Sequence, residues 1–495
     1  MAVRRRRSRD ASIRKIDFPY SVPRPGQERM TAEVFQAIQD QERLLVQAPT
    51  GIGKTMAAIF PAVNAMADGL TDKIFYLTAK TTGRTAAEKA LGELRQNGLR
   101  IKSLTLTAKE KACLNGVVSC RGEDCGFARD YYDRLADALE ELWPEDSLTR
   151  DTVERTSLSH QVCPFELARE LMSEADVIIC DYNHVLDPKA YLRRFFLEVK
   201  GRFTFLIDEA HNLAERAREM FSAEINPGSF RDLASRLKQD FPEVYSSLSK
   251  INKWLAAAKK KSQAAGGFLA EREGPDSLYP LLEEFLESAG RWTAVDSLAP
   301  FREEFLNLCF RVIDFLKIAD EYNENYATIY ERKGRDLRLK LFCLDPSGLL
   351  DRALKRGSCA VLFSATLNPM DYHREILGCP EGRILKLPSP FPKSNLCLLV
   401  CDGISARYRH RRITRAEGVG GIHALVSQKK GNYLVFLPSY EYLHLIHQSF
   451  VREYPALELM AQHPGMSEGE KTKFLERFNQ ENKGTLVGFA VMGGI

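Results

Sequence analysis

Short apolar runs that end in small or polar residues recur through the first half of the chain and again near residue 360. None of them has a helical period, and helix-compatible stretches separate them. Strands buried on both faces have this continuous apolar pattern. The runs are Arg43–Gln47, Lys73–Thr78, Asp176–Asp181, Phe203–Ile207 and Ala360–Thr366. We therefore predict an α/β domain with a doubly wound parallel sheet, whose functional residues gather at the carboxyl ends of the strands.

Residues 221–344 follow a different pattern. Apolar residues recur at helical spacing in Leu281–Leu286 and in Phe305–Ile313, and strand-like runs are few. This pattern predicts a helical insertion within the α/β domain. The stretch Lys259–Gly267 is interpreted as an exposed loop inside that insertion.

A second alternation begins after the proline-rich segment Pro388–Pro392. Its strand candidates are Asn432–Ser439 and Leu486–Val491, which predict a second α/β domain. The chain stops at Ile495, directly after a strand-like run that would lack its covering helix. We interpret this ending as a truncation of the second domain.

Composition indicates a globular protein of several domains, with 44% hydrophobic and 27% charged residues in a chain of 495. Its apolar runs are shorter than the roughly 18 residues that cross a membrane, and the N-terminus opens on the basic run Arg4–Arg7. We expect a cytoplasmic protein without a membrane partner. The net charge of +4 permits nucleic-acid binding without requiring it. We interpret Arg4–Arg7 as a disordered tail, with a nucleic-acid-binding arm as the alternative.

A glycine-bearing turn lies between the first apolar run and the helix-compatible stretch Met56–Phe60. A strand, such a turn, Lys and Thr form the arrangement that wraps backbone N–H groups around a triphosphate. An incidental glycine turn is the alternative, but the position between strand and helix favours ATP binding. The predicted nucleotide contacts are Ala48, Pro49, Thr50, Gly51, Ile52, Gly53, Lys54 and Thr55.

Two carboxylates follow the apolar run that ends at Ile207, in the sequence Asp208-Glu209-Ala210-His211. Asp208 would hold Mg²⁺ together with the Thr55 hydroxyl, and Glu209 would orient or deprotonate the attacking water. Such a pair can also be an ordinary exposed turn, but the glycine-bearing turn in the same chain favours catalysis. The candidate catalytic residues are Lys54, Asp208, Glu209 and His211.

Eleven cysteines without a secretory signal argue against a disulfide framework. Seven lie mostly in apolar contexts that predict burial, namely Cys180, Cys309, Cys343, Cys359, Cys379, Cys397 and Cys401. Four lie among charged residues and glycines and look like metal ligands, namely Cys113, Cys120, Cys125 and Cys163. Their spacings do not match a two-by-two zinc finger, and the chemistry leaves zinc, an iron–sulfur cluster and four unrelated thiols open.

Taken as a set, these residues resemble the DinG/XPD type of superfamily 2 helicases, the iron–sulfur DNA helicases, over about residues 18–495. Arg24–Met30 is similar to the adenine-recognition element of that family, with Gln27 as the base contact. Leu77–Arg84 is similar to the strand-end motif that touches the DNA backbone. Further similar motifs are Asp181–His184, Phe363–Thr366, Gly431–Tyr440 and Phe489–Gly494.

The resemblance implies an ATP-dependent DNA helicase with 5′-to-3′ polarity and a role in DNA repair, acting on single-stranded and tailed duplex DNA. The implied cofactors are ATP, Mg²⁺ and a [4Fe-4S] cluster on Cys113, Cys120, Cys125 and Cys163. The implied organisation is a basic disordered tail (1–17), a RecA-like P-loop motor domain (18–107, 167–220 and 345–387), an iron–sulfur insertion (108–166), a helical arch-like insertion (221–344) and an incomplete second RecA-like domain (388–495).

Two alternatives to that function remain. The final family motif, which supplies arginine fingers to the γ-phosphate, would lie beyond Ile495, so the chain could load ATP and bind DNA without productive unwinding. RNA unwinding is the other alternative, and the four cysteines weigh against it.

A motor that moves along any sequence must hold the phosphate backbone. Lys80, Thr81 and Arg84 are the expected contacts. Arg407–Arg412 is a second candidate patch, with a solvated charged face as its alternative.

Overall fold

The structure is a computed structural model that describes residues 13–115, 120, 124–238, 241–295, 301–334, 336–479 and 484–493. The chain divides into two compact units, residues 1–392 and 393–495. The tail predicted for residues 1–17 lies largely outside the described residues. Within the described ranges, no helix is both long and apolar enough to cross a membrane.

The first unit is built on an eight-stranded sheet in the order β12-β1-β11-β6-β2-β5-β3-β4, and its neighbouring strands run parallel. The strands are β1 (Arg43–Gln47), β2 (Lys73–Leu77), β3 (Ser103–Thr105), β4 (Ser147–Leu148), β5 (Val177–Cys180), β6 (Phe203–Asp208), β11 (Cys359–Ser364) and β12 (Arg383–Lys386). The predicted α/β fold with a large parallel sheet is confirmed.

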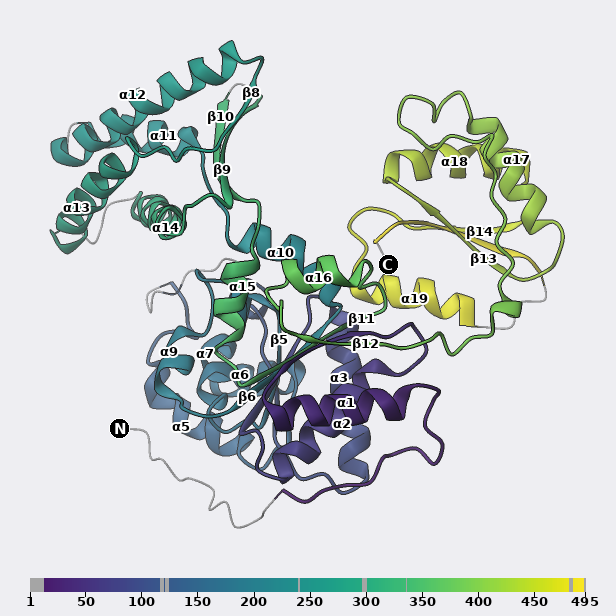
Figure 1. Cartoon of the computed structure of the whole chain (residues 1–495). Coiled ribbons are helices and arrows are strands. Elements are labelled where there is room, and N and C mark those ends of the chain that lie inside the picture. The colour runs from purple at the N-terminus through teal and green to yellow at the C-terminus, as the bar shows by residue number, and fades with distance from the viewer. Residues whose placement is uncertain are drawn as a thin grey trace. The chain divides into compact units, whose positions relative to one another are not determined.

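Helices cover both faces of this sheet (Figure 1). Tyr76 and its same-face neighbours pack with α1 (Gln27–Asp40), α2 (Lys54–Ala67) and α3 (Thr81–Gln96). Phe75 faces the other side, where the core includes α5 (Tyr131–Leu142), α6 (Arg150–His160) and α7 (Pro164–Leu171). Burial on both faces explains the continuous apolar runs of the sequence. The shorter helices of this unit are α4 (Lys109–Ala112), α8 (Asn183–Leu186), α9 (Arg193–Glu198), η1 (Ala210–Asn212), α10 (Leu213–Met220), α15 (Ser347–Leu354) and α16 (Met370–Ile376).

The insertion at 221–344 is not purely helical, and the prediction for it is corrected in this respect. Four helices, α11 (Pro227–Leu237), α12 (Pro242–Ala264), α13 (Tyr279–Val295) and α14 (Arg302–Ala319), accompany an antiparallel sheet in the order β7-β10-β9-β8 (Figure 1). Its strands are β7 (Ala223–Ile225), β8 (Phe268–Glu271), β9 (Tyr326–Lys333) and β10 (Asp336–Cys343). The predicted loop at Lys259–Gly267 is wrong up to Ala264, because α12 continues that far before Gly266 and Gly267 take positive φ angles.

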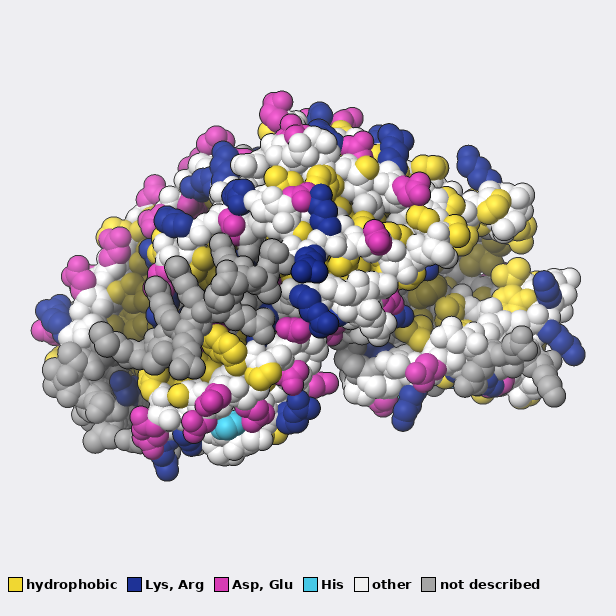
Figure 2. Space-filling view, turned by 90° about the horizontal axis from the view of Figure 1, so that it is seen from below, with side chains coloured by type: hydrophobic (Ala, Val, Ile, Leu, Met, Phe, Trp, Pro, Cys, Tyr) yellow, Lys and Arg dark blue, Asp and Glu magenta, His cyan; other side chains and the backbone are white. Residues whose placement is uncertain are grey.

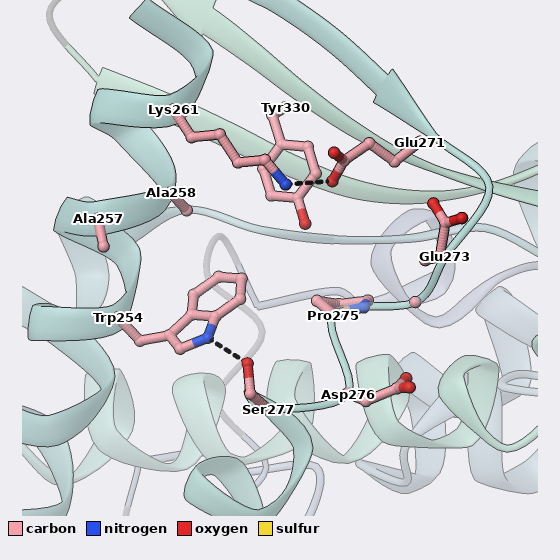
Figure 3. A pocket seen from close by; sticks show the side chains of 11 residues that line it. Trp254, Ala257, Ala258, Lys261, Glu271, Glu273, Pro275, Asp276, Ser277 and Tyr330 are labelled. Atoms are coloured by element: carbon pink, nitrogen blue, oxygen red, sulfur yellow. Dashed lines mark hydrogen bonds and ion pairs between the residues drawn. The ribbon is translucent and has the colours of Figure 1, made fainter. Parts of the chain in front are cut away.

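A groove of about 540 Å³ opens in this insertion beside α12, β8 and β9 (Figure 3). Trp254 Nε1 donates a hydrogen bond to Ser277 Oγ at 2.9 Å, and Lys261 Nζ pairs with Glu271 at 2.6 Å. Three carboxylates and one ammonium group line the groove, so its charge does not suit a nucleic-acid backbone.

The second unit contains a three-stranded parallel sheet in the order β13-β15-β14. Its elements are η2 (Lys393–Asn395), α17 (Arg415–Val426), β13 (Asn432–Leu437), α18 (Tyr440–Glu453), β14 (Glu458–Ala461), α19 (Glu468–Asn479) and β15 (Leu486–Val491). Val419, Ile446 and Phe489 belong to a hydrophobic core of its own.

Candidate nucleotide site

The turn between β1 and α2 has the backbone shape that a phosphate cradle needs. Gly51 and Gly53 have φ angles of 90° and 82°, and Lys54 is the first residue of α2. Arg24 Nη1 donates to the Gly51 carbonyl at 3.0 Å, and Gln27 Nε2 donates to the Gly53 carbonyl at 3.4 Å. With these carbonyls engaged by side chains, the backbone N–H groups at the start of α2 form an anion site.

The rest of the turn is anchored from both sides. Ala48 and Ile52 are buried in the core, and the Ala48 N–H donates to the Ser364 carbonyl at 2.9 Å. Pro49 is half-buried, whereas Thr50 and Gly51 are exposed. A Cβ atom on Gly51 would lie 2.8 Å from the ring of Phe391, so that ring packs directly on the glycine.

Gln27, predicted to contact the adenine base, is buried, and both ends of its amide are engaged. Its Oε1 accepts from the Arg24 N–H at 3.0 Å, and its Nε2 bonds to Gly53 as described above. A Cβ atom on Gly53 would lie 2.7 Å from that nitrogen. Gln27 therefore braces the turn in this structure.

Asp208 lies at the carboxyl end of β6, with its side chain buried. Burial raises the pKa of Asp208, the hydrogen bond from Tyr76 and the charge of Lys54 oppose that rise, and the Glu209 carboxylate adds to it. Tyr76 Oη donates to Asp208 Oδ2 at 3.0 Å. A buried carboxylate beside the start of α2, where Thr55 supplies a hydroxyl, is a donor set that fits Mg²⁺.

Glu209, His211 and Ser364 form a polar network at the same edge of the sheet. His211 Nδ1 lies 2.7 Å from Ser364 Oγ and 3.3 Å from Glu209 Oε2, and Ser364 Oγ donates to Glu209 Oε2 at 3.4 Å. Burial lowers the pKa of His211, and the charges of Lys80 and Lys54 lower it further while Glu209 raises it. A lowered pKa keeps the imidazole neutral near pH 7, with one nitrogen donating and the other accepting.

The backbone of this network is strained. Glu209 has a φ angle of 49°, in the left-handed region that non-glycine residues rarely occupy. The Tyr182 hydroxyl donates to the Asp208 carbonyl and, at 3.3 Å, to the Glu209 carbonyl. Sequence reasoning singled out neither Tyr76 nor the role of Tyr182. The sequence did contain a signal, because each tyrosine carries a polar hydroxyl at a position where the apolar pattern predicts complete burial, and a buried hydroxyl needs a hydrogen-bond partner.

The four candidate metal-binding cysteines lie in different environments. Cys113 and Cys163 are half-buried, Cys120 is exposed and Cys125 is buried. Cys120 and Cys163 are near enough to influence each other electrostatically. Burial raises the pKa of Cys163, and hydrogen bonds from the backbone of Glu166 and Phe165 lower it. Across the described residues, no group of three or more His, Cys, Asp or Glu residues lies close enough together to hold a metal ion. Four thiols have the right chemistry for an iron–sulfur cluster, but these four cysteines are not gathered at one point.

Five of the seven cysteines expected in the core are buried. The prediction is wrong for Cys397 and Cys401, which are exposed in the segment that follows η2. Apolar neighbours in the sequence, Leu398, Leu399 and Val400, suggested burial, but these side chains are exposed as well.

The predicted DNA-contacting residues of the first unit lie beside the nucleotide site. Lys80 and Thr81 are exposed and Arg84 is half-buried, at the start of α3. This helix follows β2, and β2 pairs with β6, which carries Asp208. The candidate DNA contacts and the candidate catalytic residues therefore share one edge of the sheet.

In the second unit, most side chains of the Arg407–Arg412 patch are exposed. Arg411 differs, since its Nη1 donates to Ser439 Oγ at 3.2 Å and its guanidinium lies 5.1 Å from the ring centre of Tyr442. It therefore anchors the patch to α18. On the face of the molecule in Figure 2, basic and acidic side chains are interspersed rather than segregated by sign.

Comparison with protein families gives three matches. The DEAD/DEAH box helicase family matches residues 28–108, the DEAD_2 family residues 85–230 and the Helicase C-terminal domain family residues 422–495. The first two contain the glycine-bearing turn and the Asp208–His211 sequence.

Three curated proteins illustrate the similarity. Regulator of telomere elongation helicase 1 of Rattus norvegicus is 24% identical over 273 residues, which is 45% of this chain and 21% of that protein. The general transcription and DNA repair factor IIH helicase subunit XPD of Arabidopsis thaliana is 23% identical, over 73% of this chain and 61% of that protein. The ATP-dependent DNA helicase DinG of Salmonella choleraesuis is 24% identical, over 59% and 49%. This chain thus spans about a fifth of the length of the first relative and about half of the third.

Among solved structures, Xpd4 of S. tokodaii superposes with a TM-score of 0.55 at 15% identity, covering 95% of this chain and 81% of that one. A likeness at this identity concerns the fold alone, and it agrees with the α/β architecture described above.

Proposed function

We propose that this chain, which belongs to the DinG/XPD type of superfamily 2 helicases, couples ATP hydrolysis to movement along single-stranded DNA. One observation carries the proposal. The turn at Lys54 and the carboxylate pair Asp208–Glu209 lie at one edge of the sheet, on either side of strand β11. Ser364 at the end of β11 connects them, since its carbonyl accepts the Ala48 N–H and its hydroxyl donates to the Glu209 carboxylate. Such an arrangement lets the residues that bind the phosphates act together with those that activate water.

Each residue of the site has a distinct role in this proposal. Lys54 contacts the phosphates, and Thr55 and Asp208 hold Mg²⁺, which neutralises charge on the phosphate oxygens when it is bound. Glu209 orients the attacking water and accepts its proton. His211 stays neutral and fixes the Glu209 carboxylate through Ser364.

Movement along DNA follows from the neighbouring residues. Lys80, Thr81 and Arg84 hold the phosphate backbone without reading base edges, so the motor can advance along any sequence. The polarity, 5′ to 3′, is carried over from the resemblance to the family. We also propose a [4Fe-4S] cluster on Cys113, Cys120, Cys125 and Cys163, because four thiolates are its usual ligands. These cysteines are not gathered at one point in the structure described, so binding the cluster would draw them together.

Steady-state ATP turnover tests the central proposal. Single-stranded DNA should stimulate turnover more than RNA of the same length, and Lys54→Ala should abolish the stimulation. Tailed duplexes with a 5′ or a 3′ overhang then report polarity. ATP binding without DNA-stimulated turnover would instead support a DNA-binding module that loads ATP.

Metal analysis tests the cluster. Protein purified without oxygen should be brown and contain about four irons per chain. Stoichiometric zinc without iron would contradict the assignment.

A further inference from the structure

We propose that Tyr76 is a positioning residue for the two magnesium ligands, holding the Asp208 carboxylate in place beside the Thr55 hydroxyl. The inference rests on the proposed function, because it assumes that Thr55 and Asp208 bind Mg²⁺ with ATP. It adds a residue that neither sequence motif contains.

Tyr76 reaches Asp208 from the neighbouring strand. In the register of β2 and β6, Tyr76 pairs with Leu206 and Leu77 with Ile207, so Asp208 lies just beyond the paired residues. Tyr76 is completely buried, and its Oη lies 3.0 Å from Asp208 Oδ2. The other oxygen, Asp208 Oδ1, accepts the Glu209 N–H at 2.9 Å. Both carboxylate oxygens therefore have a donor, which fixes the rotation of the carboxylate.

The Thr55 side chain lies near the same phenol hydroxyl and influences it electrostatically. The phenol keeps its proton near pH 7, because an ordinary tyrosine loses it only at about pH 10. A protonated phenol donates one hydrogen bond and can accept another. Tyr76 is hydrogen-bonded to Asp208 at the end of β6, and Thr55 at the start of α2 lies near the same phenol.

Helix α3 also comes close to the Asp208 carboxylate. A Cβ atom on Gly83 would lie 3.1 Å from Asp208 Oδ2 and 2.2 Å from Thr78 Oγ1. The backbone of α3 therefore packs close to the oxygen that Tyr76 contacts and leaves little free space around it. A group held this way needs little reorganisation when a metal ion binds.

Tyr76→Phe removes the hydroxyl and leaves the ring in the core. Loss of a hydrogen bond that orients a metal ligand typically lowers metal affinity about 10-fold to 100-fold. We expect the Mg²⁺ concentration that gives half-maximal enhancement of nucleotide binding to rise by about that factor. Nucleotide affinity in EDTA should be unchanged, because Lys54 and the backbone of the turn remain.

The experiment titrates MgCl₂ into the chain with a fluorescent ATP analogue and no DNA. Tyr326→Phe is the matched control, since that tyrosine is also buried but lies in β9 of the insertion, and it should behave like the parent. A Tyr76→Phe midpoint within about twofold of the parent would overturn the inference. Weaker nucleotide binding in EDTA would overturn it too, because it would indicate a general structural role.

Measurements on the unsubstituted chain distinguish a failure of this inference from a failure of the proposed function. Nucleotide binding that does not depend on Mg²⁺ in the parent would overturn both. Normal Mg²⁺ dependence with the expected Tyr76→Phe shift, but no DNA-stimulated turnover, would contradict the motor function and support the role of Tyr76.

Discussion

Lys54 and Glu209 lie on different elements, at the start of α2 and just after β6, and each is held by different neighbours. Lys54 opens α2, where backbone N–H groups contribute to anion binding with it. Glu209 is held through its side chain by Ser364 and His211 and through its carbonyl by Tyr182. Binding and turnover should therefore depend on different residues.

Glu209→Gln should keep Mg-ATP affinity and lower the turnover number by about 10²-fold to 10⁴-fold, because the amide keeps the shape but cannot accept the proton of water. Lys54→Ala should lower affinity itself. Equilibrium binding of labelled ATP and steady-state turnover, measured on both variants, test whether binding and turnover depend on different residues. Equal losses of affinity in the two variants would contradict the assigned roles.

At the scale of elements, α3 meets the nucleotide site at Gly83, where a Cβ atom would overlap Thr78 Oγ1. Gly83→Ala should therefore displace α3 or Thr78 and lower both the free energy of unfolding and Mg-ATP affinity. Gly92→Ala on the same helix is the matched control, since a Cβ there meets nothing within 4 Å. The control should be stabilised by about 0.5–1 kcal/mol, because alanine is the better helix former. Urea unfolding of both variants measures the difference.

The insertion offers a test of pH dependence at the start of β10. Arg231 donates to both carboxylate oxygens of Asp336, at 2.7 and 3.1 Å, and this pairing lowers the pKa of Asp336. A folded-state pKa below the unfolded value contributes stability above the unfolded pKa, and that contribution is lost as the pH falls. Asp336→Asn should cost less than about 1 kcal/mol at pH 7, since the pair is partly exposed. The cost should shrink as the pH falls below about 4 and vanish below the lowered pKa of the folded protein. Chemical unfolding across a pH series from 7 downward checks this, and a cost that does not change with pH would argue against the ion pair.

Strands were predictable from the sequence where both faces are buried, because such strands are continuous apolar runs. The apolar runs of β1, β2, β5, β6 and β11 needed no knowledge of their partners. The hairpin of β9 and β10 was missed because its half-buried strands carry charged residues such as Glu331 and Lys340 between apolar ones. The glycine-bearing turn and Asp208–His211 are local motifs and were predictable. Tyr76 and Tyr182 act across strands, so only the register reveals their role.

At the scale of the whole molecule, the net charge of +4 is small, and charges of both signs are interspersed on the face drawn in Figure 2. We therefore expect individual side chains, rather than the overall charge, to decide how DNA is held. Affinity for single-stranded DNA should fall as salt rises, with a log–log slope of about −0.7 per phosphate contact. Lys80→Ala should reduce the magnitude of that slope by about 0.7. Lys89→Ala, exposed further along α3, should leave the slope unchanged. Fluorescence anisotropy across a salt series distinguishes the two, and identical slopes would exclude Lys80 as a phosphate contact.

The order of strands in the large sheet also has a consequence for synthesis on the ribosome. Both neighbours of β1 in the sheet, β11 and β12, come from residues 359–386, roughly 300 residues after β1 leaves the peptidyl-transferase centre. At about 5–20 residues per second, that interval lasts roughly 15 to 60 s. Until then β1 and the turn that follows it have no strand beside them in the sheet. The unpaired apolar strand is exposed for that time, which is the condition under which nascent chains aggregate. We therefore expect a ribosome stalled before residue 359 to carry a chain that does not bind ATP.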